Sequence, residues 1–95
     1  MQMNTLFEFQ TDTKVSVLEE LTTVKSIILF NDDVNTFDWV IEALIEVCGH
    51  TPEQAEQCAW ITHLKGKCDV KNGSYEELKP MCTELLNRGL SAEIH

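Results

Sequence analysis

The sequence predicts a small α+β domain, with three helices packed on one face of a three-stranded sheet in the order β-α-α-β-α-β. Three segments repeat apolar residues at helical spacing, and three short segments have the composition or the alternation of strands. The predicted helices are not enough to cover both faces of a three-stranded sheet, so an open sandwich with helices on one face is expected. The chain has 95 residues, of which 43% are hydrophobic, so one domain with a modest core is expected.

The predicted core begins near Lys25 with a strand. Residues 26–30 are too few for a helix and are rich in branched apolar side chains. A helix is expected from about residue 36 to Cys48, with Asn35 as its N-cap and Gly49 just beyond its end. Its apolar face repeats with the helical period and comprises Phe37, Val40, Ile41, Leu44, Ile45 and Cys48.

The second helix has the clearest start signal in the chain. In the segment 51–54, Thr-Pro-Glu-Gln, the threonine is a predicted N-cap, proline suits the first helical position, and glutamine completes a capping box. Small side chains share one face, so another element can approach closely: Ala55, Cys58, Ala59 and Thr62. Gly66 is expected to end this helix after His63.

The last third of the chain predicts a strand, a helix and a closing strand. Residues 67–70 are expected to be a short strand, followed by a turn at Asn72-Gly73. Ser74-Tyr75-Glu76-Glu77 forms a second predicted capping box. The helix face that follows comprises Leu78, Met81, Cys82, Leu85 and Leu86, with Pro80 inside the helix at a cost of about 3 kcal/mol. After Gly89, alternating Leu90, Ala92 and Ile94 predict the final strand.

Residues 1–24 differ from the rest and are interpreted as a flexible N-terminal extension of a core domain at 25–95. The formal net charge of -9 argues against nucleic acid and anionic membranes as partners. No apolar run approaches the roughly 20 residues of a membrane span. A secretory signal is not recognisable. The four cysteines form no Cys-x-x-Cys pair, so buried free thiols and a cytoplasmic location are expected.

A candidate binding site begins where the first strand ends. Asn31, Asp32 and Asp33 place hydrogen-bond acceptors, two of them anionic, at the start of an apolar helix. Acceptors beside an apolar slot suit a positively charged amine that carries an apolar side chain. Local sequence alone favours a plain turn for the triplet and a helix-end histidine for His63, and both alternatives stay open at this point.

A metal or thiol site is a weaker alternative. Cysteine and histidine gather in one stretch of sequence: Cys48, His50, Cys58, His63 and Cys68. Zinc sites usually have several ligands paired at short spacing, and Cys48-Gly49-His50 is the only tight pair in this stretch, so no metal and no cofactor are expected. A nucleophilic cysteine needs an electropositive setting, and a phosphate site needs a glycine-rich loop; neither is recognisable in this acidic chain.

With these features in this order, residues 24–95 resemble the ClpS family of Clp protease adaptors. The resemblance rests on Leu29-Phe30-Asn31-Asp32-Asp33, on the spacing to His63, on Gly66-Lys67 and on residues 90–94. It implies a non-enzymatic adaptor that binds free bulky hydrophobic N-terminal residues (N-degrons). Its partners would be such peptides or proteins and the N-terminal domain of a ClpA- or ClpC-like AAA+ unfoldase. The alternative is a protein–protein interaction domain of similar fold without amine recognition, or, less favoured, a metal- or thiol-dependent protein.

The resemblance also implies roles for individual residues. Asn31, Asp33 and His63 would hold the substrate α-amino group and first peptide unit, with Asp32 nearby and acting through water. The hydrophobic pocket would comprise Asn35, Phe37, Val40, Ala59, Thr62 and Leu90. Glu76 and Lys79 would face the unfoldase. Phe37 and Ala59 stand where many relatives have methionine, so the preference among leucine and the aromatic residues is open.

Overall fold

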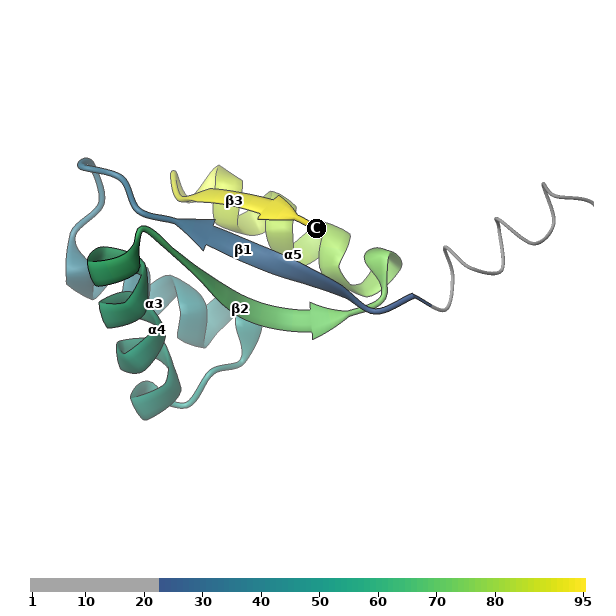
Figure 1. Cartoon of the computed structure of the whole chain (residues 1–95), viewed down its shortest axis with the longest axis horizontal. Helices are drawn as coiled ribbons and strands as arrows, with labels where there is room; N and C mark the ends of the chain where they lie inside the picture. The colour runs from purple at the N-terminus through teal and green to yellow at the C-terminus, as the bar shows by residue number, and fades with distance from the viewer. Residues whose placement is uncertain (1–22) are drawn as a thin grey trace, which may run out of the picture.

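The computed structural model describes residues 23–95, and most of the predicted extension, residues 1–22, lies outside the described residues. Figure 1 shows the six elements in the predicted order. The strands are β1 (Lys25–Phe30), β2 (Lys67–Gly73) and β3 (Ser91–Ile94), and the helices are α3 (Phe37–Cys48), α4 (Pro52–Lys65) and α5 (Tyr75–Asn87). The predicted fold class and element order are confirmed.

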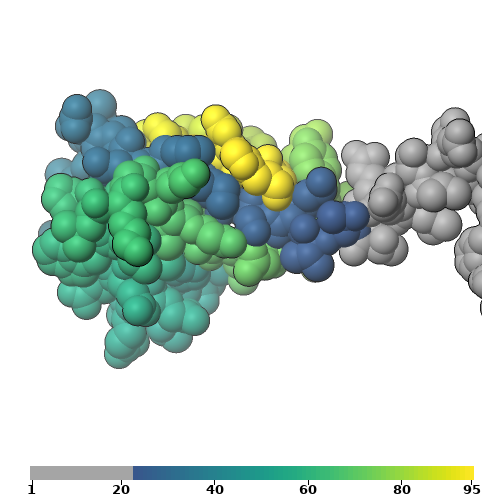
Figure 2. All heavy atoms as spheres, in the orientation of Figure 1, coloured from purple at the N-terminus to yellow at the C-terminus, as the bar shows by residue number. Residues whose placement is uncertain are grey.

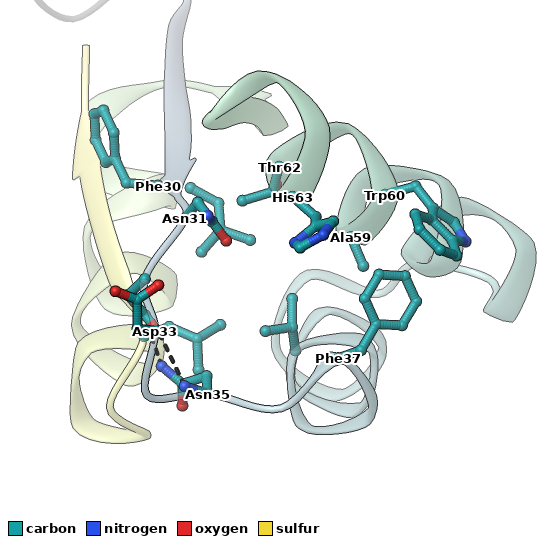
Figure 3. Close-up of a pocket in the computed structure, with 13 residues that line it drawn as sticks. Phe30, Asn31, Asp33, Asn35, Phe37, Ala59, Trp60, Thr62 and His63 are labelled. Carbon is teal, nitrogen blue, oxygen red and sulfur yellow. Dashed lines mark hydrogen bonds between the residues drawn. The ribbon is translucent and has the colours of Figure 1, made fainter.

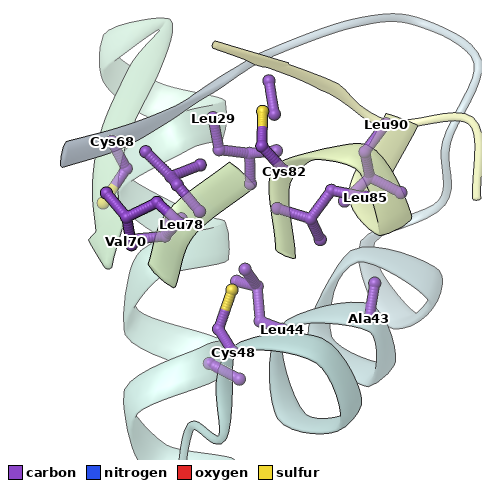
Figure 4. Close-up of a cluster of buried hydrophobic side chains, with 13 residues drawn as sticks. Leu29, Ala43, Leu44, Cys48, Cys68, Val70, Leu78, Cys82, Leu85 and Leu90 are labelled. Atoms are coloured by element: carbon purple, nitrogen blue, oxygen red, sulfur yellow. The ribbon is translucent and has the colours of Figure 1, made fainter. Parts of the chain in front are cut away.

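The sheet has the order β2-β1-β3, and both outer strands run antiparallel to β1. Leu29 pairs with Cys68 on one side and with Ala92 on the other, so these three buried side chains share one face. The helices cover this face and contribute to the same core (Figure 4). The sheet therefore has one face in the core, as antiparallel sheets of this size commonly do.

The core gathers one cluster of side chains from all six elements, and the largest fully buried members are Ile27, Leu29, Leu44, Leu78 and Leu85. Cys48, Cys68 and Cys82 are buried within it, and the fourth cysteine, Cys58, is half-buried; all four thiols are free. Leu86, predicted on the apolar face of the third helix, is 51% exposed, so that assignment was wrong. It lies one residue past Leu85, at the edge of the buried stripe.

Two of the predicted local signals are corrected by the structure. Thr36, not Asn35, caps α3, because its side chain accepts a hydrogen bond from the Trp39 amide at 3.1 Å. Asn72 and Gly73 do not form a turn after a short strand; they belong to β2, where they pair with Ser26 and Lys25. The long-range pairing with β1 outweighs the local preference of Asn-Gly for a turn.

The other predicted signals for helix starts and helix ends are confirmed. Both predicted capping boxes are present, at Thr51 and at Ser74. Gly49 and Gly66 follow their helices with the left-handed backbone that only glycine adopts at little cost (φ 72° and 93°). None of the helices within residues 23–95 is both long and apolar enough to cross a bilayer.

Candidate functional site

The segment between β1 and α3 is held in shape by Asp32. One carboxylate oxygen of Asp32 accepts the backbone amides of Val34 and Asn35 at 3.0 and 2.9 Å. The other accepts the Asn35 side-chain amide at 2.8 Å. Burial opposes ionisation of Asp32, but these hydrogen bonds, foremost those from Asn35, outweigh it and lower the pKa of the carboxyl group. Both oxygens of Asp32 are therefore engaged within the loop.

Asn35 connects this loop to the far end of the chain. The same side-chain nitrogen that bonds Asp32 also donates to the carbonyl oxygen of Gly89 at 2.9 Å. Gly89 precedes Leu90 and β3, so the contact brings the loop beside the start of the last strand. This tertiary hydrogen bonding explains why Asn35 is not free to cap α3.

The loop is also fixed to the end of α4. The Asn31 backbone amide donates to the carbonyl oxygen of Gly66 at 2.9 Å. Gly66 ends the helix that carries His63, so this bond sets Asn31 beside the last turn of α4. Residues more than thirty positions apart in sequence thus face one another in Figure 3.

These contacts surround a hollow of about 500 Å³ that opens between the loop, α3, α4 and the start of β3 (Figure 3). Its lining includes all ten residues predicted for the amine site and the pocket, together with three others: Leu29, Phe30 and Trp60. The complete predicted set is Asn31, Asp32, Asp33, Asn35, Phe37, Val40, Ala59, Thr62, His63 and Leu90. The structure therefore brings the predicted residues to one place, and their roles stay predictions.

The rim of the hollow is defined here as the polar residues Asn31, Asp33 and His63. Each of the three residues is exposed, and none of their polar side-chain atoms forms a hydrogen bond within residues 23–95. An amide oxygen, a carboxylate and a neutral imidazole nitrogen are all acceptors. The rim can therefore receive a group that offers several donors and a positive charge.

The floor of the hollow, defined here as Leu29, Val40, Ala59, Thr62 and Leu90, is apolar. Leu29, Ala59 and Leu90 are 1–3% exposed. The Thr62 hydroxyl donates to the Cys58 carbonyl at 2.8 Å, so its hydrogen-bonding need is met inside α4. The floor suits a hydrocarbon side chain because it offers contact area with few polar demands.

Trp60 is one of three lining residues, with Leu29 and Phe30, that the sequence analysis did not assign to the hollow. Its ring packs against Phe37, with centroids 4.7 Å apart, and its edge meets the His63 ring at 6.2 Å. Trp60 lies outside the small-residue face of α4, where the sequence alone allows either an ordinary surface aromatic or a contact with a partner. Its position three residues before His63 was the available signal, because residues at that spacing share a side of a helix.

The two residues predicted to face the unfoldase lie elsewhere. Glu76 and Lys79 are exposed near the start of α5, and the Lys79 ammonium lies 6.0 Å from the centre of the Tyr75 ring. The α5 helix begins just after Gly73, which pairs with Lys25, whereas the hollow adjoins the Phe30 end of β1. These residues and the hollow are therefore at opposite ends of the sheet.

The structure gives little support to metal or thiol chemistry. Among residues 23–95 there is no group of three or more histidine, cysteine or acidic side chains arranged to hold a metal ion. Burial raises the pKa of the Cys48 thiol to about 11 and that of Cys68 to about 12. Such thiols are overwhelmingly protonated near neutral pH, which disfavours nucleophilic attack.

Known proteins resemble the chain in sequence and in fold. Residues 22–93 match the family model of the ATP-dependent Clp protease adaptor protein ClpS. A ClpS adapter protein of Nitratidesulfovibrio vulgaris is 36% identical over 55 residues, which cover 56% of this chain and 55% of that protein. The chain thus matches about half the length of that curated relative. The solved structure of Agrobacterium tumefaciens ClpS2 bound to L-phenylalaninamide superimposes with a TM-score of 0.73 at 17% identity, covering 76% of this chain and 94% of the other.

Proposed function

Because the chain belongs to the ClpS family of Clp protease adaptors, we propose that it captures proteins by a free, bulky hydrophobic N-terminal residue. It then delivers them to an AAA+ Clp unfoldase–protease in the cytoplasm. The observation that carries this proposal is a set of three side chains, Asn31, Asp33 and His63, on the rim of an apolar hollow, whose polar atoms form no hydrogen bond within residues 23–95. An adaptor of this kind binds and releases its substrate without catalysing a reaction.

The chemistry of a free N-terminus matches the rim. An α-amino group has a pKa near 8, so at neutral pH it is mostly an ammonium with three donors and no lone pair. Asn31, Asp33 and His63 supply acceptors for it. An acetylated N-terminus has no charge and one donor, so it leaves acceptors without partners.

The expected affinity suits a carrier. Hydrogen bonds to a charged group contribute about 1.5–3 kcal/mol each, and burial of a leucine or phenylalanine side chain about as much. Two or three such bonds and one side chain reach roughly 8 kcal/mol, which corresponds to a dissociation constant near the micromolar range. The adaptor must release its cargo, and this affinity permits release.

Two further observations support the proposal. The ligand in the solved Agrobacterium tumefaciens structure, L-phenylalaninamide, is a free amine with an aromatic side chain. Glu76 and Lys79, at the opposite end of the sheet from the hollow, are the proposed contacts with the N-terminal domain of a ClpA- or ClpC-like unfoldase. An adaptor docked there keeps its hollow open to substrate.

One pair of peptides tests the proposal. A short peptide that starts with phenylalanine or leucine should bind with micromolar affinity by isothermal titration, whereas its N-acetylated twin should bind at least tenfold more weakly. In a reconstituted assay, the adaptor should accelerate degradation of a model protein with the same free first residue by a Clp unfoldase–protease. Equal binding of the two twins would instead favour an interaction domain without amine recognition.

A further inference from the structure

Two aromatic rings close one side of the hollow. Phe37 is the first residue of α3, and Trp60 projects from α4. Their ring centroids are 4.7 Å apart and their planes are inclined by 57°. Figure 3 shows both rings at the same edge, on the side of the hollow away from Asp33. We call Phe37 and Trp60 the aromatic wall.

The two tryptophans of the chain are placed differently. The side chain of Trp60 is 48% exposed, although it packs against the rings of Phe37 and His63. Trp39, the other tryptophan, is also partly exposed, but its indole N–H donates to the Arg88 carbonyl oxygen at 3.0 Å and so joins α3 to the end of α5. Trp60 instead presents its ring at the edge of the hollow.

We propose that the aromatic wall makes this hollow selective for N-terminal phenylalanine, tyrosine or tryptophan over leucine. This inference rests on the proposed function, since it concerns which first residue the same hollow prefers. An aromatic side chain that enters beside inclined rings gains edge-to-face contacts in addition to buried area. Leucine gains only the area.

The shape of the hollow is consistent with this preference. Ala59 contributes a single methyl group to the floor, and the cavity of about 500 Å³ has room for a flat ring. Trp60 acts mainly through Phe37, because it packs on that ring and limits the orientations available to it. Phe37 is therefore the proposed specificity contact and Trp60 a positioning residue.

The experiment compares three peptides that differ only in their free first residue: phenylalanine, leucine and cyclohexylalanine. Cyclohexylalanine has nearly the size of phenylalanine but no aromatic electrons. The protein should bind the phenylalanine peptide about threefold to tenfold more tightly than either of the others. Equal affinities for phenylalanine and cyclohexylalanine would overturn the inference, provided that the acetylated twins still fail to bind. If the acetylated twins bind as tightly as the free peptides, both the proposed function and this inference fail.

Variants of the wall identify its members. Phe37→Leu should reduce the preference for phenylalanine over cyclohexylalanine to about one, with the leucine peptide bound nearly as before. That retained binding also reports that the variant is folded. Trp60→Leu should reduce the preference partially. Retention of the full preference in both variants would overturn the assignment.

Trp39→Phe is the matched control, because it removes a partly exposed tryptophan that does not line the hollow. It should keep the preference unchanged. The chain has two tryptophans, so this variant leaves Trp60 as the only indole fluorophore. Its emission should change when the phenylalanine peptide is added and not when the acetylated twin is added. An unchanged emission at saturating phenylalanine peptide would contradict contact between ligand and wall.

Discussion

Floor side chains of the hollow are buried or half-buried, whereas rim side chains make no hydrogen bond elsewhere in residues 23–95. Leu29 and Leu90 line the hollow and are also members of the core cluster. Asn31, Asp33 and His63 are exposed. The floor is thus maintained by folding itself, and the rim is positioned through backbone contacts such as the Asn31–Gly66 bond.

This difference separates two kinds of substitution. Rim side chains contribute little to the free energy of unfolding, so their removal should affect capture and leave stability nearly unchanged. Floor side chains contribute both to capture and to the free energy of unfolding, so changes there should alter which first residue fits and also disturb packing. The neighbours Asp32 and Asp33 show the contrast within two positions, because one carboxylate organises the loop and the other accepts no hydrogen bond within residues 23–95.

The largest effect is expected from Asp33→Ala. This variant removes the one anionic acceptor of the rim, so peptide affinity should fall about tenfold to hundredfold, the equivalent of one hydrogen bond to a charged group. The melting temperature should stay nearly constant. Isothermal titration with a free phenylalanine peptide measures the first effect, and calorimetry the second.

Glu42→Ala is the matched control for this prediction. It removes an equal charge from an exposed position of α3 outside the hollow. Its effect on affinity should be small, because a solvated charge at a distance is screened by salt. Similar losses in both variants would mean that net charge, and not the position of Asp33, governs capture.

A smaller and more selective effect is expected from Ala59→Met. The longer side chain occupies part of the floor, so affinity for tryptophan- and phenylalanine-initiated peptides should fall severalfold, with less effect on leucine. The free amine should still be required, since the rim is intact. Stability is also expected to drop, by about 1–3 kcal/mol where the core does not relax. Gln57→Met, which adds the same side chain to an exposed position of α4, should change neither property.

The floor residues follow the same sequence pattern as the core, and only the family resemblance assigned them to a pocket. Val40, Ala59 and Leu90 follow the periodicity of buried positions, and a pocket wall obeys that periodicity. Trp60 does not, because the hollow meets α4 on a side that is neither core nor open solvent. A hydrophobic pattern distinguishes only those two environments, so it leaves a residue at the edge of a cavity unassigned.

Tertiary contacts account for the other errors. Asn35 and Thr36 are both good N-caps, and local sequence does not choose between them. The choice is made by Asp32 and by the Gly89 carbonyl, which lies 54 residues away along the chain. The residues of the rim were identified through the family resemblance; local sequence alone favoured a plain turn. Their convergence depends on the Asn31–Gly66 bond, which local patterns do not encode.

The smallest effect is expected from acid, and it concerns Asp32. Hydrogen bonds lower its pKa below the usual value of 3.8, so the ionised carboxylate stabilises the folded loop at any pH above that value. This contribution is lost only as the pH falls through the lower pKa of the folded protein. Peptide capture at pH 5 should therefore be unaffected by protonation of Asp32.

NMR can test this directly, because the Val34 and Asn35 amides both donate to Asp32. Their chemical shifts should titrate together with a midpoint below 3.8, and Asp32→Asn should abolish that transition. A midpoint at or above the usual value would mean that the carboxylate is not held by the loop. Other contacts would then have to hold the loop and keep Asp33 on the rim, and the proposed difference in role between Asp32 and Asp33 would be wrong.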